Sequence, residues 1–175
     1  MSRRLKFIAA FLLSLLILNA GYFLYMEEQG NFHAITPSVA YRSAQLDRDE
    51  LEYYIKKYNI SSILNLRGKN PDKSWYKEEM EVSKEQNVKH YDIALSASQK
   101  PTKEDVRKLM EIFEQAPRPI LIHCQGGADR SGLAAAMWKV IVDKKPKSEA
   151  GKQISILYGH IPIGYNTPQK LDRGI

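Results

Sequence analysis

The strongest pattern in the chain is an uncharged apolar run from Phe7 to Met26, with charged residues on both sides. About twenty residues in a helix span the hydrocarbon core of a bilayer. The run therefore predicts a membrane helix within residues 1–26, either an uncleaved anchor or a cleaved secretory signal. The anchor is favoured, because a cleavage site ending at Ala20 would begin at Leu18, which is not a small residue.

The charges that flank this run predict its orientation. Arg3, Arg4 and Lys6 precede it, and Glu27 and Glu28 follow it. Under the positive-inside rule the N-terminus stays in the cytoplasm and the rest of the chain is exported. We therefore expect the main domain outside the cytoplasm, in the periplasm of a bacterium, either tethered to the membrane or secreted if a signal is cleaved.

Beyond this segment, amphipathic stretches alternate with short apolar runs. Helices are predicted at residues 47–58, 73–86, 102–115, 132–142 and 148–158, and strands at residues 60–66, 88–95 and 120–122. This alternation predicts an α/β fold, in which a small mixed or parallel central sheet is flanked by helices.

The same pattern sets the expected domain boundaries. Residues 27–38 are interpreted as a linker because Gly30 and Pro37 disfavour regular secondary structure there. Residues 39–175 are expected to form a single domain, with an irregular tail after Gly159.

Composition narrows the possible functions. The formal net charge is +6, but the three basic residues ahead of the apolar run supply half of the excess. The positive excess of the remaining chain suits an anionic ligand. The sequence has no stripe of basic and aromatic residues, so nucleic-acid binding is not expected. The single cysteine, Cys124, excludes an intrachain disulfide and a multi-cysteine zinc site.

The segment Ile120 to Gly132, ILIHCQGGADRSG, carries the chemistry. A buried strand ends at His123, a tight loop follows, and a helix is expected to start near Ser131. Glycines in the loop let the backbone turn its N–H groups inward to form an anion-binding nest. The N-terminus of the following helix adds partial positive charge at the same place.

Each side chain of this loop has an expected role. Arg130 would clamp two phosphate oxygens, and the positive environment would favour the thiolate of Cys124, a nucleophile for phosphoryl transfer. Ser131 would donate to the sulfur as it leaves, and His123 would order the loop by hydrogen bonding. The expected substrate-binding residues form the loop itself: Gln125, Gly126, Gly127, Ala128, Asp129 and Arg130.

These residues resemble a known signature. His123-Cys124, Gly127 and Arg130-Ser131-Gly132 match the HCxxGxxR(S/T)G loop of the protein-tyrosine and dual-specificity phosphatase superfamily. The segments at residues 39–43 and 65–67 look like early segments of small bacterial dual-specificity-like phosphatases, including exported ones. The resemblance implies a small mixed sheet flanked by helices, with neither a metal nor an organic cofactor.

The proton donor for the leaving group is the open question. In the family that this loop resembles, the proton usually comes from an aspartate on a loop after an upstream strand. Here that loop, residues 96–101, holds no carboxylate. Asp92 lies in the preceding strand. Asp129 lies beside Arg130, where some bacterial phosphatases with a GKDR-type loop are thought to use an aspartate. Asp129 is favoured, with Asp92 or neither as alternatives, and Arg67 is either a second cation or a structural ion-pair partner.

Three functions follow from these patterns. The first is an anchored, exported phosphomonoesterase that forms a cysteinyl-phosphate and acts on phosphotyrosine or mixed phosphoprotein substrates. The second is a phospholipid or phosphoinositide phosphatase, motivated by the membrane segment. The third is a catalytically weak phosphate-binding module, motivated by the missing loop acid.

Overall fold

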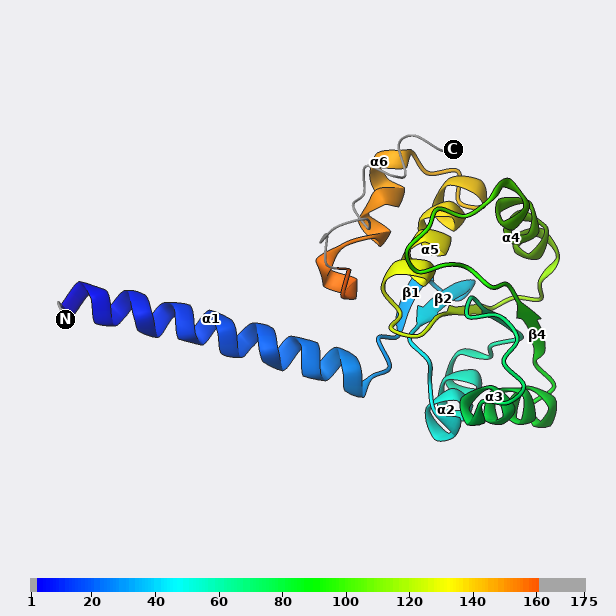
Figure 1. The fold of residues 1–175 in the computed structure, drawn as a ribbon, viewed down its shortest axis with the longest axis horizontal. Helices are drawn as coiled ribbons and strands as arrows, with labels where there is room; N and C mark the ends of the chain where they lie inside the picture. The colour runs from blue at the N-terminus through cyan, green and yellow to red at the C-terminus, as the bar shows by residue number, and fades with distance from the viewer. Residues whose placement is uncertain (1–2, 161–175) are drawn as a thin grey trace.

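The computed structural model describes residues 3–160, and its main body is built on one mixed sheet (Figure 1). The strands are β1 (His33–Thr36), β2 (Ala40–Ser43), β3 (Ser62–Asn65), β4 (Lys89–Asp92) and β5 (Ile120–His123). They lie in the order β1-β2-β5-β3-β4, and β1 is antiparallel to β2 while the other neighbours are parallel. The predicted α/β fold with a small mixed sheet is confirmed.

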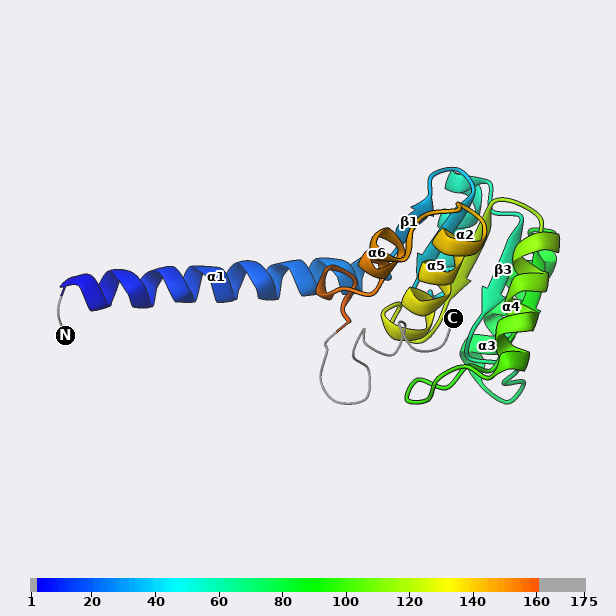
Figure 2. The same cartoon turned by 90° about the horizontal axis from the view of Figure 1, so that it is seen from above.

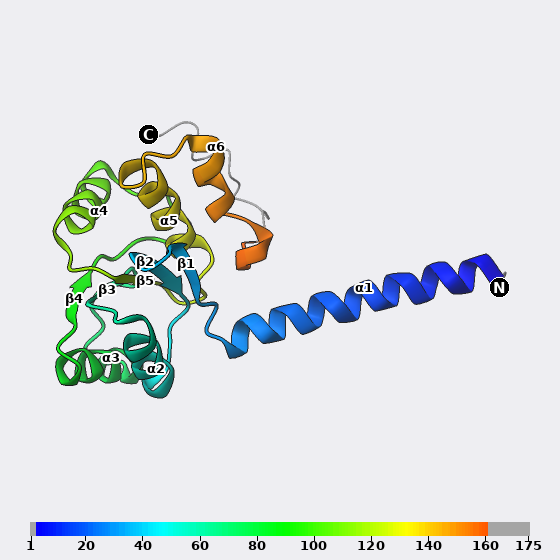
Figure 3. The ribbon, with the colours of Figure 1, turned by 180° about the vertical axis from the view of Figure 1, so that it is seen from behind.

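Helices cover both faces of this sheet. The helices of the described residues are α1 (Arg3–Glu28), α2 (Arg48–Tyr58), α3 (Ser74–Glu85), α4 (Lys103–Gln115), α5 (Asp129–Ile141) and α6 (Lys147–Ala150), followed by the 3-10 turns η1 (Gly151–Gln153) and η2 (Ile156–Tyr158). Figures 1 and 3 show α2 and α3 against one face, and α4 and α5 against the other. The layers thus sandwich the sheet between two helical pairs.

Alternation along β5 explains this sandwich. Ile120 and Ile122 pack in the core beneath α4 and α5, whereas Leu121 packs in the second core beneath α2 and α3. Because successive strand residues point to opposite faces, a wholly apolar strand is stable only when both faces are covered. The predicted buried strand is confirmed.

Two capping boxes fix where helices begin. The side chains of Asp47 and Thr102 accept hydrogen bonds from the backbone N–H groups of Glu50 and Asp105. In return, the side chains of Glu50 and Asp105 accept from the backbone N–H groups of the two cap residues. Such reciprocal bonds satisfy N–H groups that have no partner inside the helix. The predicted starts of α2 and α4 are therefore confirmed.

The predicted linker at residues 27–38 is wrong over residues 33–36, which form the edge strand β1. Just before it, Phe32 stacks on Tyr54 of α2 with ring centroids 3.9 Å apart, and it also stacks on Tyr41 and Tyr58. Pairing with β2 and stacking of this partly buried aromatic ring hold the segment against the body. Pro37 ends the strand rather than marking a flexible link.

The predicted last helix at residues 148–158 is also wrong in its extent, because α6 stops at Ala150 and two short 3-10 turns follow. The carbonyl of Gln153 accepts a hydrogen bond from buried Arg42. A carbonyl bonded to Arg42 in this way is not available for the backbone hydrogen bonds of a regular helix. The tail expected after Gly159 falls, beyond His160, outside the described residues.

The helix α1 projects away from the body (Figure 2). Among residues 3–160 it is the one helix long and apolar enough to cross a membrane, and its apolar stretch is not buried by the protein. Its last turns contact the body, because Met26 is buried and the Tyr22 hydroxyl donates to the Leu157 carbonyl. Its role as anchor or signal stays a prediction.

Candidate active site

The candidate site lies where parallel strands end. β2, β3 and β5 finish at Ser43, Asn65 and His123, which are aligned in the sheet register. Residues that follow parallel strands gather at one edge, where α/β proteins place their ligands. The loop from Cys124 to Ala128 leaves this edge and enters α5, which begins at Asp129, earlier than the sequence predicted.

The loop backbone is held from outside through its carbonyl groups. The carbonyl of Gln125 accepts from the backbone N–H of Gln45, that of Gly126 from Asn31 Nδ2, and those of Gly127 and Ala128 from the Arg42 side chain. In a trans peptide the C=O and the next N–H point in opposite directions. The N–H groups of residues 126–129 therefore point away from these partners, as an anion nest requires.

Gly127 makes this curvature possible. Its φ is +68°, in the left-handed region, and a Cβ added there would lie 2.6 Å from the Ala44 backbone nitrogen. The same Cβ would lie 2.9 Å from the Asn31 amide. Gly126 differs, because a Cβ there would meet no atom within 4 Å. Of the two loop glycines, Gly127 is the one that the geometry requires.

Arg42 is a support that the sequence analysis did not identify. It is fully buried in β2, where it bonds the carbonyls of Gly127, Ala128 and Gln153 at 2.6–2.9 Å and lies 4.5 Å from the Tyr158 ring centroid. Burial lowers its pKa to about 10, so it remains charged at neutral pH. The available signal was its position in the segment at residues 39–43, which resembles an early segment of small phosphatases.

The structure brings Cys124 and Ser131 together and Arg67 close to Arg130, while the roles expected of these residues stay predictions. Cys124 is buried, and its sulfur is hydrogen-bonded with the Ser131 hydroxyl at 3.5 Å. Arg67 donates to Gln45 and lies over the Trp75 ring. Its pKa is lowered, first by burial and then by the nearby charge of Arg130. Two guanidinium groups held close together in this way make the loop an electropositive site.

His123 belongs to a buried polar network behind the loop. Its Nε2 lies 3.1 Å from Glu79, which also contacts His90 at 2.7 Å and accepts from Gln45 at 2.7 Å. Burial by itself would raise the pKa of Glu79, but His123 and these hydrogen bonds hold it far below its usual range. The network ties α3 to the loop and fits the ordering role predicted for His123.

Asp92 is held by several donors. Asn65 and Tyr76 donate to its two oxygens at 2.9 and 2.8 Å, and His90 Nδ1 lies 3.6 Å away. Although burial tends to raise its pKa, the hydrogen bonds and the charge of His90 keep that pKa below its ordinary value. Asp92 is thus a fixed carboxylate within the network.

Asp129 has a different setting. It is the first residue of α5, its side chain is 42% exposed, and its Oδ1 lies 2.7 Å from His160 Nδ1. The His160 side chain is only 4% exposed. The sequence analysis had assigned His160 to an irregular tail, and nothing in the local pattern linked it to the loop.

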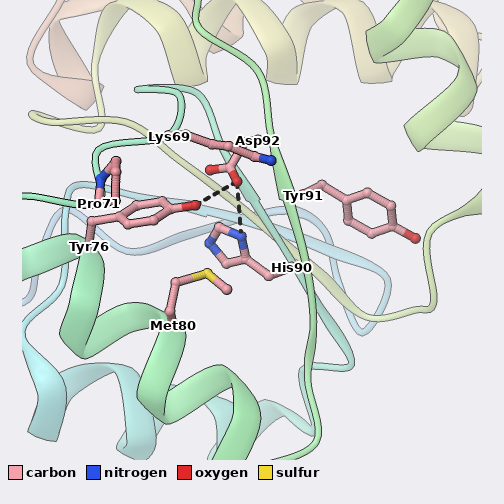
Figure 4. Close-up of a pocket in the computed structure, with 7 residues that line it drawn as sticks. All are labelled: Lys69, Pro71, Tyr76, Met80, His90, Tyr91 and Asp92. Carbon is pink, nitrogen blue, oxygen red and sulfur yellow. Dashed lines mark hydrogen bonds and ion pairs between the residues drawn. The ribbon is translucent and has the colours of Figure 1, made fainter.

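A pocket of about 510 Å³ lies beside the edge strand β4 rather than at the phosphate loop. Figure 4 shows its lining, with Tyr76 and His90 directed at Asp92. Its lining residues are Lys69, Pro71, Tyr76, Met80, His90, Tyr91 and Asp92. The pocket therefore shares the carboxylate network with the site but includes none of the loop residues.

We expect Gly127→Ala to destabilise the fold and weaken oxyanion binding, whereas Gly126→Ala leaves stability close to that of the original chain. A non-glycine residue in a left-handed conformation costs about 1–3 kcal/mol, and here its Cβ also meets backbone atoms. Urea unfolding and vanadate titration of both variants measure the difference. Equal behaviour of the two variants would refute the geometric role of Gly127.

We also expect stability to fall as the pH rises from neutral to alkaline. Burial lowers the pKa of His90, but hydrogen bonds to Asp92 and Glu79 outweigh it and raise the pKa from 6.5 to about 9. Between these values the folded state holds a proton that the unfolded state releases, so this contribution is complete below about 6.5 and is lost through about 9. Urea unfolding at several pH values should show a flatter profile for His90→Gln, and parallel profiles would contradict the assignment.

Solved structures share this fold at low identity. The core catalytic domain of the PP-IP phosphatase SIW14 from S. cerevisiae, solved with citrate, has a TM-score of 0.65 and 21% identity, covering 82% of this chain and 84% of that one. TpbA from P. aeruginosa, solved in complex with pTyr, has a TM-score of 0.55 and 19% identity, covering 74% and 75%. At these identities the likeness concerns the fold.

The sequence comparison identifies the family. No curated protein matches the chain. Residues 25–160 match the family described as "DSP-PTPase phosphatase fused to NAD+ Kinase", and the matched region includes the whole loop from Cys124 to Arg130. Because this match covers most of the sequence, the chain belongs to that family and is a phosphatase of the dual-specificity and protein-tyrosine type.

Proposed function

We propose that the protein is a membrane-anchored, exported phosphomonoesterase in which Cys124 is the nucleophile. The observation that carries the proposal is the buried Cys124 at the start of a loop whose carbonyls are turned outward onto Gln45, Asn31 and Arg42. The inward N–H groups and the N-terminus of α5 then surround a phosphate with partial positive charge. Family membership supports an enzyme rather than a binding module.

Two displacement steps complete the reaction. In the first, Cys124 Sγ bonds to phosphorus, the bond from phosphorus to the leaving oxygen breaks, and that oxygen takes a proton from an acid. In the second, water attacks phosphorus and gives a proton to the carboxylate left by the first step, the sulfur–phosphorus bond breaks, and inorganic phosphate and the cysteine thiolate are released. Ser131, hydrogen-bonded with the sulfur at 3.5 Å, would stabilise the departing thiolate.

Arg130 would provide the phosphate clamp. It lies in the first turn of α5, where its planar guanidinium can bond two equatorial oxygens as charge develops in the transition state. Burial lowers the pKa of Arg67, and the nearby charge of Arg130 lowers it further. Arg67 would add a second cation at the mouth of the site. The Gln45 and Trp75 contacts would keep Arg67 in place.

We assign the proton donor to Asp129. An acid needs a proton to give, and the donors around Asp92 favour its charged form. Asp129 instead is half-exposed beside the loop, and its oxygen shares a short hydrogen bond with His160. A carboxyl group in that position can reach a leaving oxygen above the loop and exchange protons with solvent.

Phosphotyrosine or mixed phosphoprotein substrates are the first candidate class. A structurally similar protein, TpbA, has been solved in complex with pTyr. A second class, membrane phospholipid phosphomonoesters, is favoured by the position of the loop relative to α1. Only Gln29 and Gly30 separate the end of α1 from Asn31, whose amide binds the Gly126 carbonyl.

The export of the catalytic domain rests on charge. Arg3, Arg4 and Lys6 precede the apolar helix, and Glu27 and Glu28 are the first charges after it. Under the positive-inside rule this distribution leaves the body on the non-cytoplasmic side. The tether would then confine the enzyme to substrates near that surface.

Cys124→Ser should abolish hydrolysis of an aryl phosphate and leave phosphate binding largely intact, because serine keeps the size of the side chain and the nest stays in place. Steady-state kinetics and isothermal titration with phosphate give the two readouts. Activity of the variant within about tenfold of the original would rule out the cysteine mechanism, because loss of a catalytic nucleophile lowers kcat by far more than that.

Asp129→Asn should slow hydrolysis of phosphotyrosine by about a hundredfold or more, because the tyrosine oxygen must be protonated as it leaves. Hydrolysis of an aryl phosphate whose leaving group departs unprotonated should fall much less. Comparison of kcat/KM on the two substrates measures this dependence.

Asp92→Asn is the matched control for that experiment. It should show little dependence on the leaving group, since Asp92 is held as a carboxylate. The reverse pattern would transfer the acid role to Asp92. Equal loss on both substrates in Asp129→Asn would show that Asp129 only shapes the loop.

The substrate class can be separated by a panel assayed with the full chain reconstituted in vesicles. We expect turnover of phosphotyrosine peptides and slower turnover of phosphoserine peptides, because their alkoxide leaves less readily. Phospholipid phosphomonoesters should also be hydrolysed at a measurable rate. Phosphate release is the measurement, with Cys124→Ser as the blank. Turnover confined to the lipids would move the assignment to the second class.

A further inference from the structure

The turn η2 exposes adjacent apolar side chains beside the apolar helix. Ile156 is 58% exposed and Leu157 is 62% exposed. Figure 2 shows η2, at the orange end of the colour scale, next to the end of α1. The Tyr22 hydroxyl donates to the Leu157 carbonyl at 2.7 Å, which joins the two elements directly.

The position of Tyr22 along α1 sets the depth of η2. Tyr22 precedes Met26, the last residue of the apolar run, by about one helical turn, a rise of about 6 Å. A tyrosine at this place belongs to the boundary between acyl chains and head groups, where aromatic side chains concentrate. The group bonded to its hydroxyl, Leu157, lies at the same boundary when α1 spans a bilayer.

The same short segment contacts the phosphate loop. The Tyr158 ring lies 4.5 Å from the Arg42 guanidinium, and the Tyr158 carbonyl accepts from Asn31 at 3.1 Å. Asn31 binds the Gly126 carbonyl through that same amide nitrogen. His160, two residues further on, contacts Asp129. Residues 156–160 therefore connect the exposed turn to Asp129 and to the residues that hold the loop.

We propose that Ile156 and Leu157 insert into the bilayer interface and hold the phosphate loop at the membrane surface. The partner is the lipid bilayer itself, and the proposal rests on α1 acting as an anchor. Continuity with the apolar surface of α1 distinguishes η2 from the scattered exposed apolar residues that any surface carries. The turn forms a second contact point, so the body is oriented as well as tethered.

Spin labelling of the full chain in phosphatidylcholine vesicles tests this contact. In a Cys124→Ser background the chain has no other cysteine, so Leu157→Cys and Ile156→Cys each take one nitroxide. Collision rates with oxygen, which concentrates in lipid, and with a polar nickel chelate, which stays in water, report the surroundings. Leu12→Cys within α1 and Met110→Cys, exposed on α4, are the controls.

We expect the oxygen-to-nickel ratio at residues 156 and 157 to be several-fold higher than at residue 110. A ratio equal to that at residue 110 would place η2 in water and overturn the proposal. Low collision rates with both reagents would show protein contact, such as a second copy of the chain, and would also overturn it. A water-like ratio at residue 12 would instead refute the anchor on which the proposal rests, whatever residue 157 shows.

Discussion

The candidate site depends above all on one buried cation, Arg42. Its guanidinium holds the carbonyls of Gly127, Ala128 and Gln153, so one side chain fixes the phosphate loop and the segment after α6 together. A buried charge is tolerated only when hydrogen bonds replace lost water, and these carbonyls are the replacement. The loop carbonyls thus solvate Arg42, and Arg42 in turn holds the curvature that Gly127 permits. Gly132 belongs to the same arrangement, since a Cβ there would lie 2.9 Å from Arg42 Nη2.

Local signals were sufficient for α2 to α5 and for β3, β4 and β5, whereas β1 and β2 were not predicted as strands. Asp47 and Thr102 act through neighbours three residues away, and the apolar run at Ile120 needs no knowledge of the rest of the chain. The errors arose where distant residues decide the local structure. Phe32 is ordered by rings of β2 and α2, and the last helix is interrupted because the Gln153 carbonyl turns to Arg42 in β2. Neither partner is visible from local periodicity.

The site shows the same division. The loop from Cys124 to Arg130 could be found in the sequence because its chemistry occupies one short segment. Its supports come from residues far away in the chain: Asn31 and Arg42 before it, Glu79 in α3, and His160 after α5. A histidine or an asparagine alone gives no signal of such a contact. Sequence therefore identified the groups proposed to act on the substrate, and only the structure revealed the groups that hold them.

The burial of Cys124 would have a further chemical consequence under the proposed export of the catalytic domain. This chain has one cysteine, so Cys124 has no second thiol with which to form an intrachain disulfide. Peroxide that reached it would produce a sulfenic acid whose reversal requires a thiol from another molecule. At 2% exposure beneath the loop, the sulfur is shielded from large oxidants. In an oxidising compartment, the lifetime of the active enzyme would then depend on small reductants that can enter the phosphate site.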